Sequence, residues 1–380
     1  MPPFLPGLEL CRLYYRDAVR PLLDREYPDL VYSAARIDSG SEVLGFDTER
    51  STDHEWGPQL QLFLAPRDAD GVGGAVSALL AAELPTQVRG GPTHFEPPGE
   101  RIRQMAASPT GGPVAHRVEV TDLTSWCVGQ LGFDPLAGAG PRTLDWLATP
   151  TQRLAGATSG AVYHDGLGTL GEARARLRWY PEDVWRYVLA SQWVRISQEE
   201  AFVGRTAEAG DDLGSRVLAA RMVRELMRMA LLLRRRYPPY SKWLGTAFAR
   251  LPGVSPVAEL LRAALASNDA GERQAHLGHA YTAVAGWQNA TGLADALDTA
   301  TRPFLDRPYP VLDAGRFAAA LLARITDPVL ARTPPVGAVD QFVDSTDVLE
   351  RPALFRGLTA VVVPPATESD RAASRMGAQL

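Results

Sequence analysis

Apolar positions in the first 150 residues follow both helical and strand periodicities. Residues 7–23 and 75–84 carry apolar side chains near helical spacing, so each is expected to form a helix. Residues 30–37, 55–65 and 114–120 are short apolar runs bounded by turn residues, which is typical of strands. These elements predict a sheet with helices packed on it.

From about residue 180 the periodicity becomes that of longer helices. Helices are expected over residues 184–198, 212–237, 257–266, 272–288 and 314–325. The chain is therefore predicted to have an α+β fold, with an N-terminal mixed β-sheet and its helices followed by a mainly α-helical C-terminal domain. The predicted parts are a domain over 1–150, a helical domain over 151–360 and a flexible tail over 361–380, and residues 135–180 are expected to bridge the halves.

Composition narrows the class of protein. The chain has 380 residues, 46% of them hydrophobic, which is enough to bury a core. It contains no apolar run of 18 residues and no secretory signal pattern, so neither a membrane span nor export is expected. Two cysteines make no disulfide framework, and a cytoplasmic location is expected. The net charge of −5 argues against a nucleic-acid partner held by a general basic field.

One basic residue differs from all the others. The chain has 39 Lys and Arg residues, and Lys242 is the only lysine among them. A coding bias toward arginine would explain the arginines. A compact ammonium group on a flexible stem nevertheless differs chemically from a planar guanidinium, so Lys242 is a candidate functional residue.

The segment from residue 38 to residue 57 carries the most specific chemistry. Gly40-Ser41 follows a predicted strand, and a glycine there would let a phosphate approach the backbone while the serine hydroxyl and amides bind its oxygens. If a strand begins at Asp53, Asp53 and Glu55 face the same side roughly 6.6–7 Å apart. Such carboxylates can share two divalent cations, and Mg²⁺ suits an all-oxygen site that includes phosphates. The alternative is a solvated edge strand.

A second glycine motif, Gly166-Leu-Gly-Thr-Leu-Gly171, matches the pattern of dinucleotide-binding loops. No βαβ unit is expected around it, and Pro181 limits the helix that it would open. We therefore interpret this motif as an ordinary loop.

The spacing from Gly40-Ser41 to Asp53-His-Glu55 resembles the signature of the DNA polymerase β-like nucleotidyltransferase superfamily. More closely, GSEVLGFDTERSTDHEWGPQLQLFL resembles an uncharacterised bacterial nucleotidyltransferase-like family, a domain of unknown function. That resemblance extends through WYPEDVWRYVLASQWVRISQEEAFVGR, RRRYPPYSKWLGTAF and VDQFVDSTDVL, and so covers nearly the whole chain to about residue 360.

The resemblance implies roles for particular residues. Asp53 and Glu55 would bind the metal, and Gly40 and Ser41 would hold the triphosphate. Glu119, in an apolar-acid-apolar pattern, would complete the metal site or act as general base, and Asp122 is the competing candidate. The chain departs from the common pattern in two places, since Thr52 stands where a serine is usual and the second acid is a glutamate.

The helical half offers positive charge for the phosphates. Arg224 and Arg228 belong to a basic stripe on the long predicted helix, although a solvated basic face is the alternative. Lys242 resembles the basic residues with which the helical domain of antibiotic nucleotidyltransferases contacts the triphosphate. Glu199 and Glu200 close another helix, where they could recognise an amine or hydroxyl-rich acceptor or form a plain polar helix end.

The expected function is Mg²⁺-dependent transfer of a nucleoside monophosphate from a nucleoside triphosphate, with ATP as the expected donor and two Mg²⁺ ions. The acceptor is expected to be a hydroxyl of a small molecule, and pyrophosphate is released. One alternative is a protein hydroxyl as acceptor, as in adenylylating antitoxins. Another is a nucleotide-binding regulatory module without turnover.

Overall fold

The computed structural model describes residues 4–96, 103–108 and 112–363, and the C-terminal tail predicted over 361–380 lies outside them from residue 364 onward. The chain divides into two compact units. The first comprises residues 1–141 and 153–178, and the second comprises residues 142–152 and 179–380. The two units thus alternate along the chain, whereas the sequence analysis placed one boundary at residue 150.

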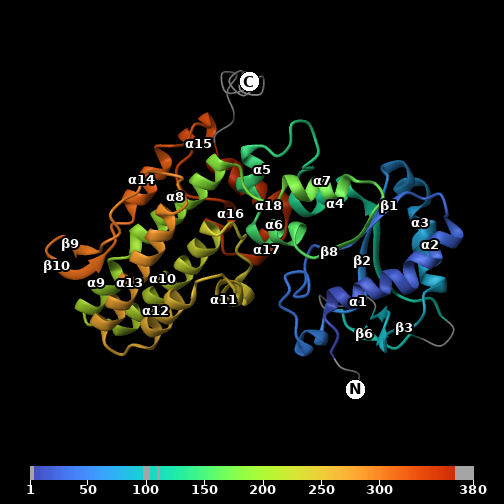
Figure 1. The fold of residues 1–380 in the computed structure, drawn as a ribbon, viewed down its shortest axis with the longest axis horizontal. Coiled ribbons are helices and arrows are strands. Elements are labelled where there is room, and N and C mark those ends of the chain that lie inside the picture. The colour runs from blue at the N-terminus through green and yellow to red at the C-terminus, as the bar shows by residue number, and fades with distance from the viewer. Residues whose placement is uncertain (1–3, 97–102, 109–111, 364–380) are drawn as a thin grey trace. The chain divides into compact units, whose positions relative to one another are not determined.

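The first unit is built around a mixed four-stranded sheet (Figure 1). Its strands are β1 (Tyr32–Arg36), β2 (Gln59–Leu64), β7 (Arg117–Asp122) and β8 (Ala161–Asp165), in the order β7-β2-β1-β8. Strands β2 and β7 are parallel, while β1 is antiparallel to both β2 and β8. The mixed N-terminal sheet predicted from the sequence is confirmed. Strand β8 lies in the stretch expected to bridge the halves, and although it follows residue 150 it belongs to the first unit.

Helices and short strands complete the first unit. They are α1 (Gly7–Tyr14), the π-helical turn η1 (Tyr15–Val19), α2 (Arg20–Glu26), the 3₁₀ turn η2 (Glu49–Asp53), α3 (Pro66–Glu83), β3 (Gln87–Val88), β4 (Gly91–Pro92), β5 (His94–Phe95), β6 (Met105–Ala106), α4 (Leu123–Leu131) and α7 (Thr169–Arg176). Helix α6 (Thr151–Thr158) contains the division between the two units.

The two faces of the sheet have different characters. Alternate strand residues, among them Ala34, Leu62 and Val118, join the side chains of α1, α2 and α3 in one hydrophobic core. The residues between them point to the opposite face. That face carries Gln61 on β2 and Glu119 on β7, which are register partners. This face thus combines polar side chains with buried apolar ones such as Phe63, which packs against Trp126 of α4.

The second unit is helical, as predicted (Figure 1). Its elements are α5 (Thr143–Ala148), α8 (Glu182–Glu199), α9 (Phe202–Glu208), α10 (Asp212–Leu233), α11 (Ser241–Ala249), α12 (Ser255–Ala266), α13 (Ala270–Asn289), β9 (Arg302–Phe304), β10 (Arg307–Val311), α14 (Gly315–Leu322), α15 (Pro328–Arg332), α16 (Val339–Phe342), α17 (Thr346–Leu349) and α18 (Pro352–Val362). Helix α10 packs against α8, α9 and α13, and α14 packs against α8. Because α8 has neighbours on several sides, more than half of its residues are buried, including the polar Ser191 and Gln192. Within the described residues, no helix combines the length and apolarity that crossing a membrane requires.

Candidate functional site

The Gly40-Ser41 turn lies directly after β1, as the sequence predicted. Gly40 adopts φ +138°, a conformation that L side chains rarely take, and an added Cβ would lie 2.5 Å from Glu42 Oε1. The turn closes through the Phe46 N–H, which donates to the Ser41 carbonyl at 2.8 Å. Among the described residues, the Ser41 hydroxyl has no hydrogen-bond partner. The turn is thus a tight, glycine-dependent loop with a free hydroxyl.

A buried ion pair supports this turn from below. Arg36, at the end of β1, contacts Glu42 Oε1 at 2.6 Å and donates to the carbonyls of Ile37 and Ser39. Both side chains are almost fully buried. Because the N–H donors of the Arg36 guanidinium are hydrogen-bonded within the turn, Arg36 stabilises the shape of the loop and is not available to a ligand.

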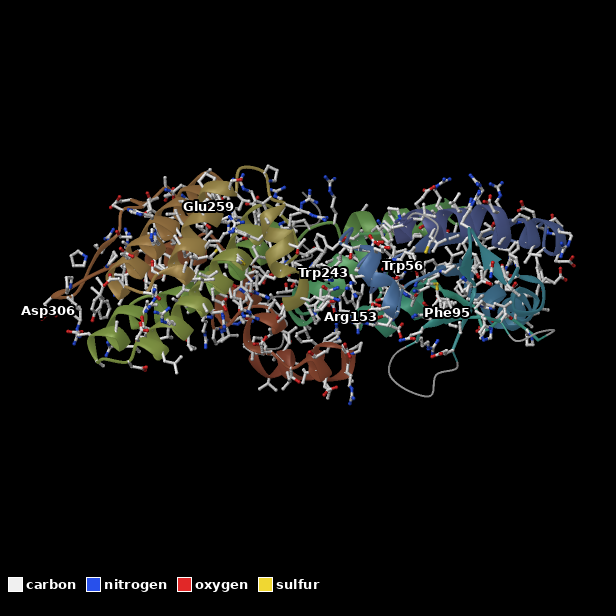
Figure 2. All side chains as sticks on the ribbon, turned by 90° about the horizontal axis from the view of Figure 1, so that it is seen from below. Trp56, Phe95, Arg153, Trp243, Glu259 and Asp306 are labelled. Carbon is white, nitrogen blue, oxygen red and sulfur yellow. The ribbon has the colours of Figure 1, made fainter. Side chains whose placement is uncertain are left out.

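Asp38 is brought to the rim of this turn by an unusual backbone conformation. Its φ is +82°, and its N–H donates to the Gly156 carbonyl at 3.1 Å. Arg153 of α6 lies 3.5 Å from Asp38 Oδ1 and is labelled in Figure 2. Burial raises the pKa of the Asp38 carboxyl, although the charges of Arg153 and Arg36 oppose that rise. A non-glycine residue held at positive φ next to a candidate loop marks a strained, closely determined site.

The strand predicted over residues 55–65 is present as β2, but it does not extend back to Asp53, so the condition for a paired Asp53 and Glu55 is not met. Residues 49–53 form the 3₁₀ turn η2, and β2 begins only at Gln59. Glu55 has φ +48° instead of an extended conformation. The local cause is the capping box between Thr48 and Ser51, which winds the chain into a turn before the apolar run of β2 begins. Asp53 and Glu55 therefore do not alternate along a strand.

The two acids of this motif have separate partners. Asp53 is mostly exposed, and its Oδ1 lies 2.8 Å from His54 Nδ1. Glu55 is hydrogen-bonded to the backbone of Arg103. The Glu55 N–H donates to the Arg103 carbonyl, and Glu55 Oε1 accepts from the Arg103 N–H at 2.7 Å. Its other carboxylate oxygen accepts from Arg117 of β7. Glu55 thus belongs to the same edge of the sheet as β7, while Asp53 points to solvent.

Glu119 lies on the polar face of the sheet beside Asp38. Gln61 connects this part of the site, since its Oε1 accepts from the Ile37 N–H at 3.0 Å and its side chain hydrogen-bonds to Glu119. Partial withdrawal from water, followed by the nearby charge of Asp38, raises the pKa of Glu119. The competing candidate, Asp122, instead caps helix α4 by accepting from the Ser125 N–H at 2.9 Å. Of the two acids, Glu119 is therefore the one available for chemistry.

The sheet thus brings together part of the predicted site. The end of β1 with Gly40-Ser41, the start of β2 and the start of β7 share one edge, because β1 runs antiparallel to β2 and β7 runs parallel to it. Asp38, Glu55 and Glu119 lie at this edge. Asp53 does not turn toward it.

We tested whether this edge fits the expected pair of Mg²⁺ ions. Within the described ranges, no three His, Cys, Asp or Glu side chains are grouped so that they could hold a metal ion. Arg117 and the Arg103 N–H engage the Glu55 carboxylate, and Asp53 is paired with His54. The predicted ligand set of Asp53, Glu55 and Glu119 does not fit a metal in this arrangement.

The predicted phosphate-binding residues of the helical half all lie in the second unit. Arg228 is buried and paired with Asp340 at 3.0 Å, so its charge is already neutralised. Arg224 is partly exposed and contacts Glu225 and Asp344. Lys242 is exposed near the start of α11, with its Nζ 5.1 Å from the centre of the Trp243 ring. Burial in the helix bundle thus separates Arg228 from the other two, which reach solvent.

The Gly166–Gly171 loop is an ordinary loop in the structure, as interpreted. It joins β8 to α7, and the amides of Gly168 and Gly171 donate to the Asp165 carboxylate at 3.0 and 2.9 Å. Since a side chain of the chain itself takes the place that a phosphate would occupy, this loop offers no dinucleotide site.

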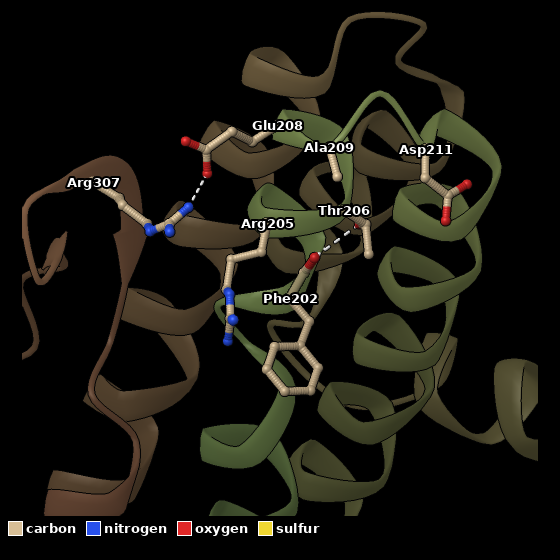
Figure 3. Close-up of a pocket in the computed structure, with 7 residues that line it drawn as sticks. All are labelled: Phe202, Arg205, Thr206, Glu208, Ala209, Asp211 and Arg307. Atoms are coloured by element: carbon tan, nitrogen blue, oxygen red, sulfur yellow. Dashed lines mark hydrogen bonds and ion pairs between the residues drawn. The ribbon is translucent and has the colours of Figure 1, made fainter.

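An open cavity of about 520 Å³ lies in the second unit beside α9 (Figure 3). Arg307 pairs with Glu208 there, and Arg205 lies over the ring of Phe202. Asp211 caps α10 by accepting from the Gly214 N–H. Because its charged side chains already have partners on a wide, open surface, this cavity is a weak candidate for a binding site.

Sequence reasoning missed four residues of the sheet-edge site: Asp38, Gln61, Arg117 and Arg153. Arg117 and Glu119 are two residues apart in a predicted strand, so period-two alternation could have placed them on one face. The other contacts join residues 24 to 115 positions apart, and no local pattern signals them.

Comparison with known families adds one match. The family described as "Domain of unknown function (DUF4037)" matches residues 146–244, about a quarter of the chain. The matched segment contains Arg153, Arg224, Arg228 and Lys242, but it begins after Glu119 and does not include Gly40-Ser41. No curated protein matches the chain. The chain is therefore similar to a family without an assigned activity.

Proposed function

We propose that the first unit binds a nucleoside triphosphate at the edge formed by the ends of β1, β2 and β7, and transfers its nucleoside monophosphate to a hydroxyl of a small molecule. The observation that carries the proposal is the juxtaposition of the Gly40-Ser41 turn with Asp38 and Glu119. A glycine-dependent turn with a free hydroxyl suits phosphate oxygens, and carboxylates beside it suit proton transfer. ATP as donor and a cytoplasmic location stay predictions.

The step follows from the residues at this edge. The acceptor oxygen attacks the α-phosphorus, the bond from that phosphorus to the bridging oxygen breaks, and pyrophosphate leaves with the bonding pair. Glu119 takes the proton of the acceptor hydroxyl as general base. Arg153 and Arg117 border the site, where they are paired with Asp38 and Glu55, and a phosphate would have to compete with these carboxylates for them.

Mg²⁺ belongs to the proposal as an expectation, and no part of the step is derived through it. A metal would require Glu55 to leave Arg117 and Asp53 to leave His54. Glu55 would also have to leave the Arg103 N–H, so the present arrangement of these side chains does not fit the metal.

Turnover tests the proposal. Each of the four nucleoside triphosphates is incubated with the full chain, a panel of small hydroxyl compounds, and Mg²⁺ or a chelator, and pyrophosphate release is measured. We expect release with at least one triphosphate and a fall of about 10²–10⁴-fold in Glu119→Gln. Glu9→Gln, which changes an exposed acid of α1 paired with Arg12, serves as the matched control. Equal activity of Glu119→Gln and Glu9→Gln would exclude Glu119 as base.

A nucleotide-binding module without turnover is the second candidate, and one observation favours it. Arg117 and the Arg103 N–H both donate to the Glu55 carboxylate, which the transferase signature assigns to metal binding. Titration calorimetry together with the pyrophosphate assay separates the two functions, because the module binds a triphosphate with or without Mg²⁺ and releases no pyrophosphate.

A protein acceptor needs a separate test. Mass spectrometry of lysate proteins after incubation with enzyme and ATP would reveal a protein acceptor by its added nucleotide mass.

A further inference from the structure

A stretch of chain without acids begins in α10 and continues through α11. Residues 226–258 contain no Asp or Glu, although the whole chain has 44 of them. The same residues contain six basic side chains, of which Arg228 is buried. The other five are exposed: Arg234, Arg235, Arg236, Lys242 and Arg250. A chain with a net charge of −5 thus carries a local positive surface.

Four of these cations have no acidic partner. In the part of the chain that the structure describes, Arg234, Arg235, Arg236 and Lys242 form no ion pair. Arg216, at the start of the same α10 helix, is by contrast paired with an acid. The four unpaired cations, together with Tyr240 and Trp243, are called the basic track below.

Two guanidinium groups of the basic track lie over tryptophan rings. Arg234 Cζ is 4.9 Å from the centre of the Trp287 ring, and Arg235 Cζ is 4.5 Å from the centre of the Trp185 ring. The Trp185 ring is itself held in place, because its Nε1–H donates to the Leu232 carbonyl at 3.0 Å. A guanidinium that lies over a ring keeps the N–H groups at its edge for phosphate oxygens. Both groups are therefore oriented before a ligand arrives.

An arginine occupies the left-handed position that ends α10. Arg235 has φ +53°, which glycine adopts more easily than any residue with a Cβ. The Arg236 N–H donates to the Leu231 carbonyl at 2.9 Å, and the Arg235 N–H donates to the Leu232 carbonyl at 3.1 Å. This is the position that glycine usually takes after a helix. An arginine there costs stability, which indicates that its charge has a use outside the fold.

The middle of the segment is anchored in the helical unit. Residues 237–239 are buried, and the Pro238 carbonyl accepts from the Thr151 hydroxyl at 2.7 Å. The Tyr240 N–H donates to Gln152 Oε1 at 3.1 Å. The exposed side chains on both sides of this anchor are therefore presented by a fixed backbone.

Aromatic rings lie among the cations. Tyr240 is 48% exposed, and Trp243, which is labelled in Figure 2, is partly exposed with its ring centre 5.1 Å from Lys242 Nζ. Lys242 follows Arg234 by eight positions, so their Cα atoms are at most about 29 Å apart. Residues 234–250, all of which the structure describes, present no exposed large aliphatic side chain. The basic track is thus a short surface of charges and rings.

This combination selects among polyanions. The phosphates of a nucleic-acid strand pair with cations, and its unpaired bases stack on exposed aromatic rings. A duplex keeps its bases stacked inside, so the rings would add little to its binding. A lipid surface would be bound through apolar side chains that insert between the lipids, and the basic track has no aliphatic ones.

We propose that the basic track binds single-stranded nucleic acid, with backbone phosphates on its four cations and a base on Tyr240. The proposal does not depend on nucleotidyl transfer, and the track shares no residue with the sheet-edge site. ATP and a nucleic-acid strand both offer phosphates to Lys242, and the experiment distinguishes them.

Fluorescence anisotropy on the full chain measures the binding of labelled oligouridylate and oligothymidylate, each about twelve nucleotides long. Four phosphate contacts predict that affinity falls about 50-fold between 50 mM and 200 mM salt. We expect the duplexes formed with the complementary strands to bind about fivefold more weakly or less, because they offer no base for stacking.

Three results would overturn the proposal. The first is the absence of binding by both single strands at 50 mM salt. The second is duplex binding as tight as that of the single strands. The third is displacement by ATP or by phosphatidylserine vesicles that is as effective, per phosphate, as displacement by the unlabelled strand.

A double variant locates the phosphate contacts. Arg236→Gln/Lys242→Gln is expected to weaken strand binding about tenfold or more at 50 mM salt and to reduce the salt slope by about 1.4. Both side chains are exposed and have no ionic partner, so their loss leaves the fold intact. The control Arg216→Gln/Arg262→Gln makes the same change in net charge at two paired arginines and should bind as the wild type does. Equal binding by the two double variants would refute the location.

Tyr240→Ala separates stacking from charge. We expect strand binding to weaken about fivefold or more with an unchanged salt slope, because this variant removes a ring and no charge. The Tyr240 side chain makes no capping hydrogen bond to α11, so the helix keeps its start. Wild-type affinity in Tyr240→Ala would overturn the assignment to a ligand with unpaired bases.

Discussion

At the scale of single residues, several acids that look free in the sequence serve the backbone. Asp165 holds the amides of Gly168 and Gly171, Asp122 caps α4, and Glu200 accepts from the N–H groups of Leu312 and Ala314. The unfavourable acid at the end of α8 is thus a clamp on the segment before α14. Acids with this structural use are poor candidates for catalysis, and Glu55, which accepts from the Arg103 N–H, is one of them, so Asp38 and Glu119 are the acids of interest.

Glu200 should make stability depend on pH. Burial raises the pKa of Glu200 from its ordinary value of 4.5 to about 7, although the two N–H donors oppose that rise. The folded chain therefore binds this proton more tightly than the unfolded chain. The contribution of Glu200 to stability is greatest below about pH 4.5, falls as the pH rises to about 7, and then stays level. The total loss is at most about 3 kcal/mol.

Urea unfolding at pH 5 and pH 8 measures this effect. Glu200→Gln has no ionisable group at this position, so its unfolding free energy should fall less between the two pH values than that of the wild-type chain. Glu208→Gln, which changes an exposed acid in α9, should follow the wild type. A parallel pH response in Glu200→Gln and the wild type would show that Glu200 does not titrate in this range.

At the scale of elements, the site depends on the close approach of α6 to the end of β1. A Cβ added at Gly156 would lie 2.2 Å from the carbonyl oxygen of Asp38, which is backbone and cannot move aside cheaply. At the same place the Gly156 carbonyl accepts from the Asp38 N–H, and Arg153, one turn earlier in α6, lies beside the Asp38 carboxylate. A glycine in a helix is thus the condition for the strained turn that holds the candidate carboxylate.

Gly156→Ala should therefore destabilise the chain by about 1–3 kcal/mol through overpacking. Gly74→Ala provides the matched change within α3, where an added Cβ meets nothing within 4 Å. That variant should be neutral or gain about 0.5–1 kcal/mol from better helix propensity. Thermal unfolding of both variants checks the prediction, and a stable Gly156→Ala chain would show that α6 can shift away from β1.

At the scale of the whole molecule, the residues proposed for nucleotide transfer all belong to one unit. The edge formed by the ends of β1, β2 and β7 lies in the unit with the sheet. The sequence analysis instead assigned triphosphate contacts to Arg224, Arg228 and Lys242 of the second unit. The two assignments therefore predict that a bound nucleotide protects amides in different units of the chain.

Hydrogen exchange maps these footprints. ATP at about 100 times its dissociation constant would stabilise the binding-competent state by about 2.7 kcal/mol, so amides that open within the site should exchange more slowly. We expect slower exchange over residues 36–45 and 117–121. Residues 255–266 of α12, which supply no residue to the proposed site, serve as the internal reference. Slower exchange confined to residues 221–228 would move the nucleotide to the helical unit and contradict the proposed site.

The sequence by itself determined the class of the fold and the place of its main elements, because hydrophobic periodicity records which face of each helix or strand is buried. It also predicted a turn at Gly40-Ser41 and a strand that contains Glu119, whose signals are local. Only the tertiary structure decided which acids meet. Strand pairing brought Glu55 to Arg117 and Gln61 to Glu119, and a glycine contact brought α6 to Asp38. Contacts between distant segments depend on register and close packing, which leave no periodic trace in the chain.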